Sequence, residues 1–316
     1  MRYPFTAVFL FFVLTVAAQR REELFDYSFT PAKAGGYYYV ATEKNDSLWK
    51  RKAWFLAQKT LYMEGWYKDD SCKIGHGPFM WFHPNGMLRL KGHFVNGKRE
   101  GVFLSYHENG LLKDSTTYVK GRKNGIGLGF HENGYPSDST NFDGNGNGVE
   151  IRWHDDGALA TAGYWTQDTL KTGRWKYYHR NGNLMATEDY DAKGKLLQCN
   201  CFEENGRELD TALCREKEAF IDLKQWRRFL EKNLGAFIEQ KAREGISGSF
   251  TVVVSFVVNT DGTLADMKAL TNYGHGIEEG ILRIMKKAPV WVPARSHGRL
   301  VKSYHLQPIS FEVSNE

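Results

Sequence analysis

One short pattern recurs six times along the chain, and it constrains the fold more than any other feature. Each copy starts with an aromatic residue and ends with glycine, as in YHENG at residues 106–110. The final glycines are Gly86, Gly110, Gly134, Gly157, Gly182 and Gly206, so successive copies stand about 24 residues apart. A fixed period of this size predicts a repeat architecture in which each unit packs on its neighbours.

Each repeat is predicted to be one β-hairpin. Asn-Gly between alternating strands is a strong hairpin signal, because both residues accept positive φ in a tight turn. The return turns between hairpins are expected at a second set of glycine pairs: Gly97 and Gly101, Gly121 and Gly125, Gly144 and Gly148. A single hairpin is unstable alone in water. We therefore expect a long antiparallel meander whose hairpins stack and share an aromatic face.

The strings GKREG at 97–101 and GRKNG at 121–125 complete a recognisable pattern. Together with the Asn-Gly turns they resemble MORN repeats, in the variant with a Y-x-x-N-G turn and a following G-K-x-x-G. The resemblance covers residues 60–209. A strand-rich lead-in at 19–59 is expected to join the same sheet. MORN-like arrays imply contact with proteins or lipids rather than a particular chemistry.

A histidine occupies the same place in five of the six copies, which raises the question of a metal ladder. These histidines are His83, His107, His131, His154 and His179. Each unit contributes two strands, so equivalent positions lie roughly 10 Å apart. Zinc needs ligand nitrogens roughly 3–4 Å from each other. The pattern therefore favours a stripe of histidines beside the turns, which can respond to mild acid, over a metal site.

Two glycine-rich strings imitate ligand loops. Residues 143–148, DGNGNG, match the start of an EF-hand loop, but His154 stands where a bidentate glutamate is required. Residues 125–129, GIGLG, do not lie between a strand and a helix as a phosphate loop does. We expect both strings to be turns.

The first 18 residues predict a cleavable secretory signal. Arg2 is followed by an apolar run at 7–16, and small residues at 16–18 precede Gln19. The alternative is a retained membrane anchor, but the run is short for a bilayer span of roughly 20 residues. The mature chain is therefore expected outside the cytoplasm, anchored in the inner membrane only if this segment is retained.

Export also bears on the four cysteines, Cys72, Cys199, Cys201 and Cys214, because it permits disulfides. Cys199 and Cys201 are too close in sequence to pair comfortably, and either one could reach Cys214. A Cys-x-Cys metal site is the alternative, but it lacks a second Cys or His pair at useful spacing.

The net charge of +5 includes no long basic run, which argues against nucleic acid as a partner.

After Cys214 the pattern changes to mixed helices and strands. Residues 216–243 have helical spacing, 250–258 form a strongly β-branched strand, 259–262 a turn, 264–270 a second strand, 277–285 a helix and 300–313 a last strand. The order α-β-β-α-β favours a small sheet with helices on one face. The predicted fold class is thus mainly β plus α+β, with a meander followed by a two-layer domain at 215–316.

The C-terminal segment resembles the TonB C-terminal domain. The resemblance rests on Gly248, the VNTDG turn at 258–262, the string APVWVPA at 288–294, Gly298 followed by Leu300-Val301, and LQPISF at 306–311. It implies a periplasmic protein that binds an outer-membrane TonB-dependent transporter by adding the transporter's plug peptide as a strand. The implied docking residues are Val301, Lys302, Ser303, Tyr304, His305 and Leu306.

Three prolines and a tryptophan in this region have structural explanations. Pro308 has no N–H to donate, so it limits pairing at that point and discourages indiscriminate edge association. Trp291 is expected in the core, with Pro289 and Pro293 fixing the crossing segment around it.

Three classes of function remain after these motifs. The first is the TonB-like peptide binder, and the second is a scaffold that contacts envelope proteins through the repeat sheet. Within the first class, binding without force transduction is favoured, because residues 1–18 lack the Ser and His of a transducer's anchor and the chain has eight prolines and no Pro-rich spacer. The third class, an enzyme, lacks support in the motifs. We therefore expect no catalytic residue, cofactor, metal or small-molecule substrate.

Overall fold

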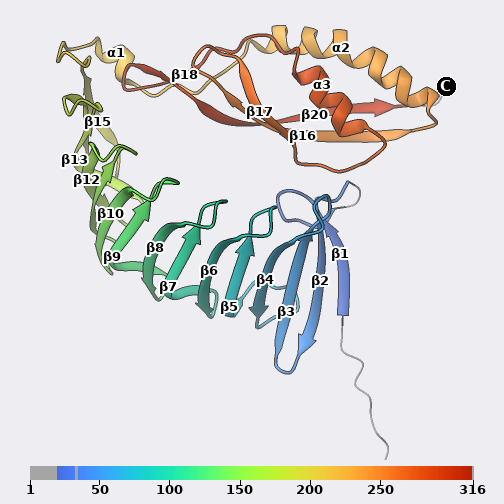
Figure 1. The fold of residues 1–316 in the computed structure, drawn as a ribbon, viewed down its shortest axis with the longest axis horizontal. Helices are drawn as coiled ribbons and strands as arrows, with labels where there is room; N and C mark the ends of the chain where they lie inside the picture. The colour runs from blue at the N-terminus through green and yellow to red at the C-terminus, as the bar shows by residue number, and fades with distance from the viewer. Residues whose placement is uncertain (1–19, 33–34, 315–316) are drawn as a thin grey trace, which may run out of the picture.

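A computed structural model describes residues 20–32 and 35–314. The predicted signal segment at 1–18 lies outside the described residues. Figure 1 shows two parts: a long curved sheet and a C-terminal domain that lies across the side toward which the sheet curves.

Fifteen antiparallel strands form one sheet in which every strand pairs with its neighbours in sequence. We call it the repeat sheet. Its strands are β1 (Arg20–Phe25), β2 (Tyr38–Asn45), β3 (Leu48–Phe55), β4 (Leu61–Tyr67), β5 (Gly75–Phe82), β6 (Leu88–Val95), β7 (Lys98–Tyr106), β8 (Leu112–Val119), β9 (Arg122–Phe130), β10 (Pro136–Asp143), β11 (Gly148–Trp153), β12 (Leu159–Thr166), β13 (Leu170–Tyr178), β14 (Leu184–Tyr190) and β15 (Leu196–Cys201). The predicted meander is confirmed, and β1 to β3 place the lead-in in the same sheet.

The repeated turns differ from the prediction in their backbone geometry. Gly110 has φ of +84°, but Asn109 does not have positive φ. Gly110 donates its N–H to the carbonyl of His107 (2.9 Å), and His107 donates to Leu111 (2.9 Å). This is a three-residue loop with glycine in the left-handed position, not the predicted two-residue turn. Both positive φ values occur instead at the return turn, at Asn96 and Gly97.

The repeated Asn and His side chains connect each turn to the next one. Each His donates Nε2–H to a carbonyl in the following unit, because a carbonyl oxygen can only accept. The five pairs are His83 with Tyr106, His107 with Phe130, His131 with Trp153, His154 with Tyr178, and His179 with Phe202, at 2.8–3.1 Å. Asn109 similarly donates to the carbonyl of Glu132 (3.0 Å). The histidines thus hold the turns together.

One repeat departs from this arrangement in sequence and compensates with an ion pair. Asp156 stands where the other turns have asparagine, so it has no amide hydrogen to donate. Arg180 from the next turn bonds the Asp156 carboxylate instead (2.8 Å). The backbone N–H of Ala158, and after it this Arg180 bond, keep the pKa of Asp156 below its usual range. The connection between turns therefore survives the substitution.

Along one side of the repeat sheet, which we call the aromatic face, rings cover glycines on the neighbouring strand. A Cβ atom on Gly92 would lie 2.3 Å from Phe103, and one on Gly163 would lie 2.1 Å from Trp175. This placement buries Phe103 to 2% exposure although the sheet is a single layer.

The glycines of the string at 125–129 also lie inside a strand, β9, which corrects the predicted turn there.

The C-terminal domain has the predicted order of elements with two additions. A short helix α1 (Thr211–Cys214) precedes α2 (Leu223–Arg243), β16 (Gly248–Val258), β17 (Leu264–Ala269), α3 (Ile277–Met285), β18 (Ala294–Ser296), β19 (Arg299–Val301) and β20 (Ser303–Val313). The three-stranded sheet has the order β17-β16-β20, and β18 pairs with β19.

Two predicted element boundaries in this domain are wrong. The long helix begins at Leu223 rather than at 216, where the Asp222 side chain caps it by accepting the N–H of Gln225 (2.9 Å). The preceding segment is extended, and Phe220 forms a bridge with Val292. The last strand is divided into β19 and β20. The first difference arises from pairing with a segment far away in sequence, and the second arises because β19 forms a local hairpin with β18.

The core of the C-terminal domain lies between its sheet and its helices. Val252, Val254, Phe256 and Val258 project from β16 and are fully buried with Ile277 and Ile281 of α3. Trp291 is also buried, as predicted, and its ring packs on Phe256 (5.3 Å between centroids).

Candidate functional site

The structure places the six predicted docking residues on two strands and the residue between them. Val301 ends β19, where it pairs with Ala294, and Lys302 lies between β19 and β20. Ser303, Tyr304, His305 and Leu306 begin β20, which is an edge strand of the three-stranded sheet. The edge continues to Val313, beyond the predicted residues. We call the outer side of β20 the docking edge.

The register shows which backbone groups of β20 face this edge. Leu270 donates its N–H to the carbonyl of Val253 (2.8 Å), so the backbone groups of Val253 are directed toward β17. Val253 pairs with Pro308, whose backbone groups must therefore point away from β16, toward the docking edge. The same alternation directs the N–H and C=O groups of Tyr304, Leu306, Ser310 and Glu312 outward. Pro308 interrupts the row of donors because it has no N–H.

The side chains of β20 follow the same alternation. Tyr304 and Leu306 are 65% and 48% exposed and lie on the face away from the helices. His305 points the other way and packs against Phe256 and Trp291, with ring centroids 5.8 and 5.4 Å away. Burial lowers the pKa of His305, while the charge of Glu218 acts in the opposite direction. His305 thus anchors the start of β20 to the core of the domain.

The C-terminal domain also meets the start of the repeat sheet. Gly35 lies against Tyr273, so close that a Cβ atom on Gly35 would be 2.5 Å from the ring. Figure 1 shows the loops next to β1 and β2 beneath the C-terminal domain. Burial raises the pKa of Tyr37, and the neighbouring phenol of Tyr304 adds to that effect. This arrangement places the first residues of the docking edge close to the repeat sheet.

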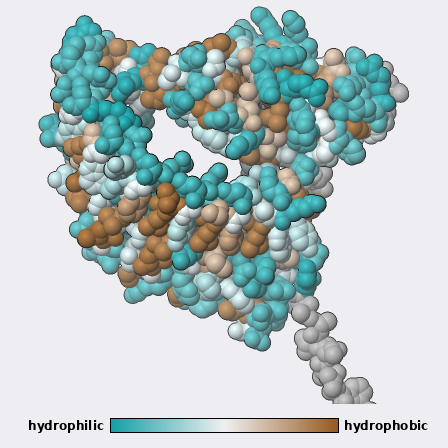
Figure 2. Space-filling model, in the orientation of Figure 1, coloured by the Kyte–Doolittle hydropathy of each residue, from teal (hydrophilic) through white to brown (hydrophobic). Residues whose placement is uncertain are grey.

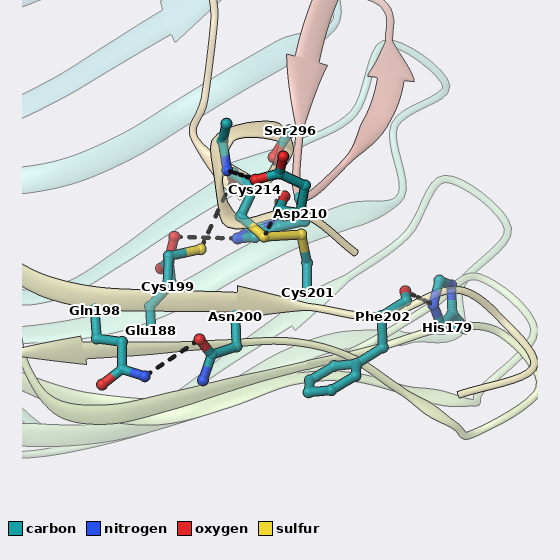
Figure 3. The surroundings of a disulfide bond; sticks show 12 residues. His179, Glu188, Gln198, Cys199, Asn200, Cys201, Phe202, Asp210, Cys214 and Ser296 are labelled. Carbon is teal, nitrogen blue, oxygen red and sulfur yellow. Dashed lines mark hydrogen bonds and ion pairs between the residues drawn. A yellow bond between two sulfur atoms is a disulfide. The ribbon is translucent and has the colours of Figure 1, made fainter. Parts of the chain in front are cut away.

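A disulfide joins the other end of the repeat sheet to the C-terminal domain. Cys201 at the end of β15 is bonded to Cys214 at the end of α1, which settles the pairing that the sequence left open (Figure 3). Leu209 donates to the carbonyl of Cys201 (2.8 Å), which returns the chain to the sheet and brings Cys214 within reach. Cys72 and Cys199 are free thiols.

A buried carboxylate beside this disulfide connects the two parts of the molecule. Glu188 on β14 is 4% exposed and accepts hydrogen bonds from Lys171, Tyr177 and Tyr190 within the repeat sheet. Its other oxygen lies 3.1 Å from Nε2 of His297, on the turn between β18 and β19. Burial alone would raise the pKa of Glu188, but the hydrogen bonds from His297 and the tyrosines and the charge of Lys171 hold it well below its usual range.

Sequence reasoning missed Glu188 and His297, because no motif contains either residue. The only local signal in the sequence was Gly298, which favours a turn. In the structure His297 and Gly298 both have positive φ and form a tight turn between two short strands. Nothing local indicates that this turn lies against β14, 109 residues earlier in the sequence.

The arrangement around the disulfide suits a structural joint rather than catalysis. A cavity of about 1010 Å³ lies here, lined by Glu188, Cys199 and Glu216 among others. Burial raises the pKa of the Cys199 thiol, so it is a poor nucleophile, and Glu188 is saturated with donors. Across residues 20–32 and 35–314, no three His, Cys, Asp or Glu side chains gather as a metal site would require.

The glycine-rich string that imitates a calcium loop forms a turn held by its own aspartate. Asp143 Oδ1 accepts the backbone N–H groups of Asn145 (2.7 Å) and Asn147 (3.0 Å). The hydrogen bond from the Asn147 side-chain amide, together with these backbone bonds, lowers the pKa of Asp143. Among the helices that the structure describes, none is both long enough and apolar enough to cross a bilayer.

Comparison with known proteins supports the repeat assignment at two places. The family model described as MORN repeat variant matches residues 75–96 and 171–192. These residues correspond to the hairpins β5–β6 and β13–β14, which lie in the predicted repeat region. No curated protein matches the chain.

Proposed function

We propose that this protein is a periplasmic peptide binder whose C-terminal domain takes an extended segment of an outer-membrane TonB-dependent transporter as an additional strand on β20. The observation that carries the proposal is the docking edge, where the backbone groups of Tyr304, Leu306, Ser310 and Glu312 face outward without a partner strand. Backbone hydrogen bonds along such an edge provide affinity, and neighbouring side chains select the peptide.

The surroundings of the edge support strand addition of limited length. Pro308 leaves a gap in the row of donors, so an added strand is expected to bond mainly on either side of it. Exposed Tyr304 and Leu306 offer apolar contact to alternate side chains of the peptide. Binding serves energy-coupled transport in this proposal, and the resemblance to TonB C-terminal domains supplies the class of partner.

The proposal is tested by removing one outward N–H without touching the core. Leu306→Pro deletes an N–H that faces the edge, and Leu306→Ala removes only the side chain. A synthetic peptide carrying a transporter's plug-end box is titrated into the full chain by calorimetry. Loss of binding in the proline variant with an unchanged melting temperature, and near-normal binding in the alanine variant, supports strand addition. Equal binding by all three proteins contradicts it.

A second candidate function is a scaffold that contacts envelope proteins through the repeat sheet. The exposed apolar side chains on that sheet favour it, since isolated sheets in water normally keep such residues covered. The two candidates predict different results in the peptide experiment, because the scaffold function predicts that the C-terminal domain does not bind the transporter peptide.

A further inference from the structure

The repeat sheet carries a continuous apolar surface opposite the aromatic face. We call it the apolar face. Its large side chains come mainly from alternate strands: Met80 from β5, Val102 and Leu104 from β7, Ile126 and Leu128 from β9, and Val149 and Ile151 from β11, with Tyr164 added from β12. Ile126 is 67% exposed and Val102 54%. Figure 2 shows apolar side chains gathered in a band over the middle of the sheet.

The strand register aligns these side chains into two parallel rows. Leu104 stands opposite Ser115, which stands opposite Leu128. Leu128 is followed in the same way by Ser139 and Ile151. The second row contains Ile126, Asn141, Val149 and Tyr164, and Val102 lies on the same side of β7. The small polar residues between them leave the apolar side chains raised, so the rows form a surface suited to packing against another sheet.

The two flanks of the apolar face have opposite charges. The repeated turns on one flank carry Glu108 and Glu132, whose side chains are 69% and 80% exposed. The return turns on the other flank carry Lys98, Lys120 and Arg122, all exposed. A two-fold axis along the sheet, perpendicular to the strands, reverses the strand direction of the second copy. It therefore places the acidic flank of one copy over the basic flank of the other on both sides.

We propose that the apolar face is a dimer interface occupied by a second copy of this chain in that orientation. The face from β5 to β12 measures about 34 Å across the strands and about 26 Å along them. This footprint is close to the roughly 800 Å² that each partner of a stable complex buries. The interface is independent of the docking edge, so each copy of the dimer presents its own β20.

The first test is the molar mass of the full chain by light scattering after size-exclusion chromatography, over a concentration series. The wild type is expected to be a dimer. Ile126→Glu buries a charge at the centre of the interface and should raise the dimer dissociation constant by about 100-fold or more. Leu223→Glu is the control, because Leu223 is 79% exposed on α2, outside the apolar face. It should leave the dimer intact.

A charge-reversal experiment tests the orientation. One variant carries Glu108→Lys with Glu132→Lys, and the other carries Lys98→Glu with Lys120→Glu. Each variant alone opposes like charges and should dissociate about tenfold more readily, whereas a mixture of the two restores complementary flanks and should dimerise. A monomeric wild type, a dimer that survives Ile126→Glu, or two variants that fail to pair when mixed would overturn the proposal.

Discussion

In the repeat sheet, an aromatic ring on one strand covers a glycine on the next, and a histidine in one turn bonds a carbonyl in the following turn. In the C-terminal domain, by contrast, side chains from a sheet and two helices meet in a single core. The repeat sheet is thus stabilised by contacts between neighbours, and the domain by contacts between segments far apart in sequence. A substitution should therefore act locally in the first part and cooperatively in the second.

The largest effect is expected from the core of the C-terminal domain. Phe256 is fully buried, so Phe256→Ala should cost about 4 kcal/mol and destabilise the whole domain. Hydrogen exchange read by mass spectrometry follows both parts separately. Exchange should accelerate in β16, β20 and α3 while β5 to β10 stay protected. Uniform acceleration along the chain would show that the two parts unfold as one unit.

The joint between the two parts should give the next largest effect, and it should depend on pH. Glu188→Gln leaves buried donors without a carboxylate and should cost about 3 kcal/mol at pH 7. The folded-state pKa of Glu188 lies below its ordinary value of 4.5, so the carboxylate stabilises above that pH, and its contribution is lost as the pH falls toward the folded value. Melting temperatures of the wild type and the variant should therefore converge in acid. A constant difference down to low pH would contradict this assignment.

A smaller and more local effect is expected at the glycines under the rings. Gly92→Ala forces the Phe103 ring to move and should destabilise the repeat sheet by about 2 kcal/mol. Gly235→Ala is the matched control, since a methyl group there meets nothing within 4 Å in the middle of α2. It should stabilise by about 0.5–1 kcal/mol. Urea unfolding measures the free energy of unfolding of both variants. If both substitutions change it in the same direction, the proposed role of the glycines under the rings is wrong.

The smallest effect should come from a single step of the turn ladder. His107→Ala removes one bond to the carbonyl of Phe130 and should cost about 1 kcal/mol. Faster amide exchange is expected in the turns around 107–111 and 131–135 only. His93→Ala serves as the comparison, because His93 is an exposed strand residue outside the ladder. Equal changes in both variants would show that the ladder does not stabilise the turns.

The same contrast explains how much the sequence could predict. Hairpins were found from the 24-residue period because each one is specified by residues close together in the chain. The start of α2 at Leu223 was missed because Phe220 forms its bridge with Val292, more than 70 residues away. The division between β19 and β20 was missed because β19 closes a short hairpin with β18 that no turn motif indicated. The joint of Glu188 and His297 could not be predicted either, because the two residues lie 109 residues apart in sequence. At the candidate site the sequence located β20, but only the pairing of Val253 with Pro308 shows which backbone groups face outward.

Amide exchange along β20, followed by nuclear magnetic resonance with and without a transporter-derived peptide, tests the docking edge most directly. The outward N–H groups of Tyr304, Leu306, Ser310 and Glu312 should exchange quickly in the free protein and become protected when the peptide binds. Their odd-numbered neighbours already bond to β16 and should change little. Protection that appears equally on odd and even residues, or only on the repeat sheet, would contradict strand addition at β20.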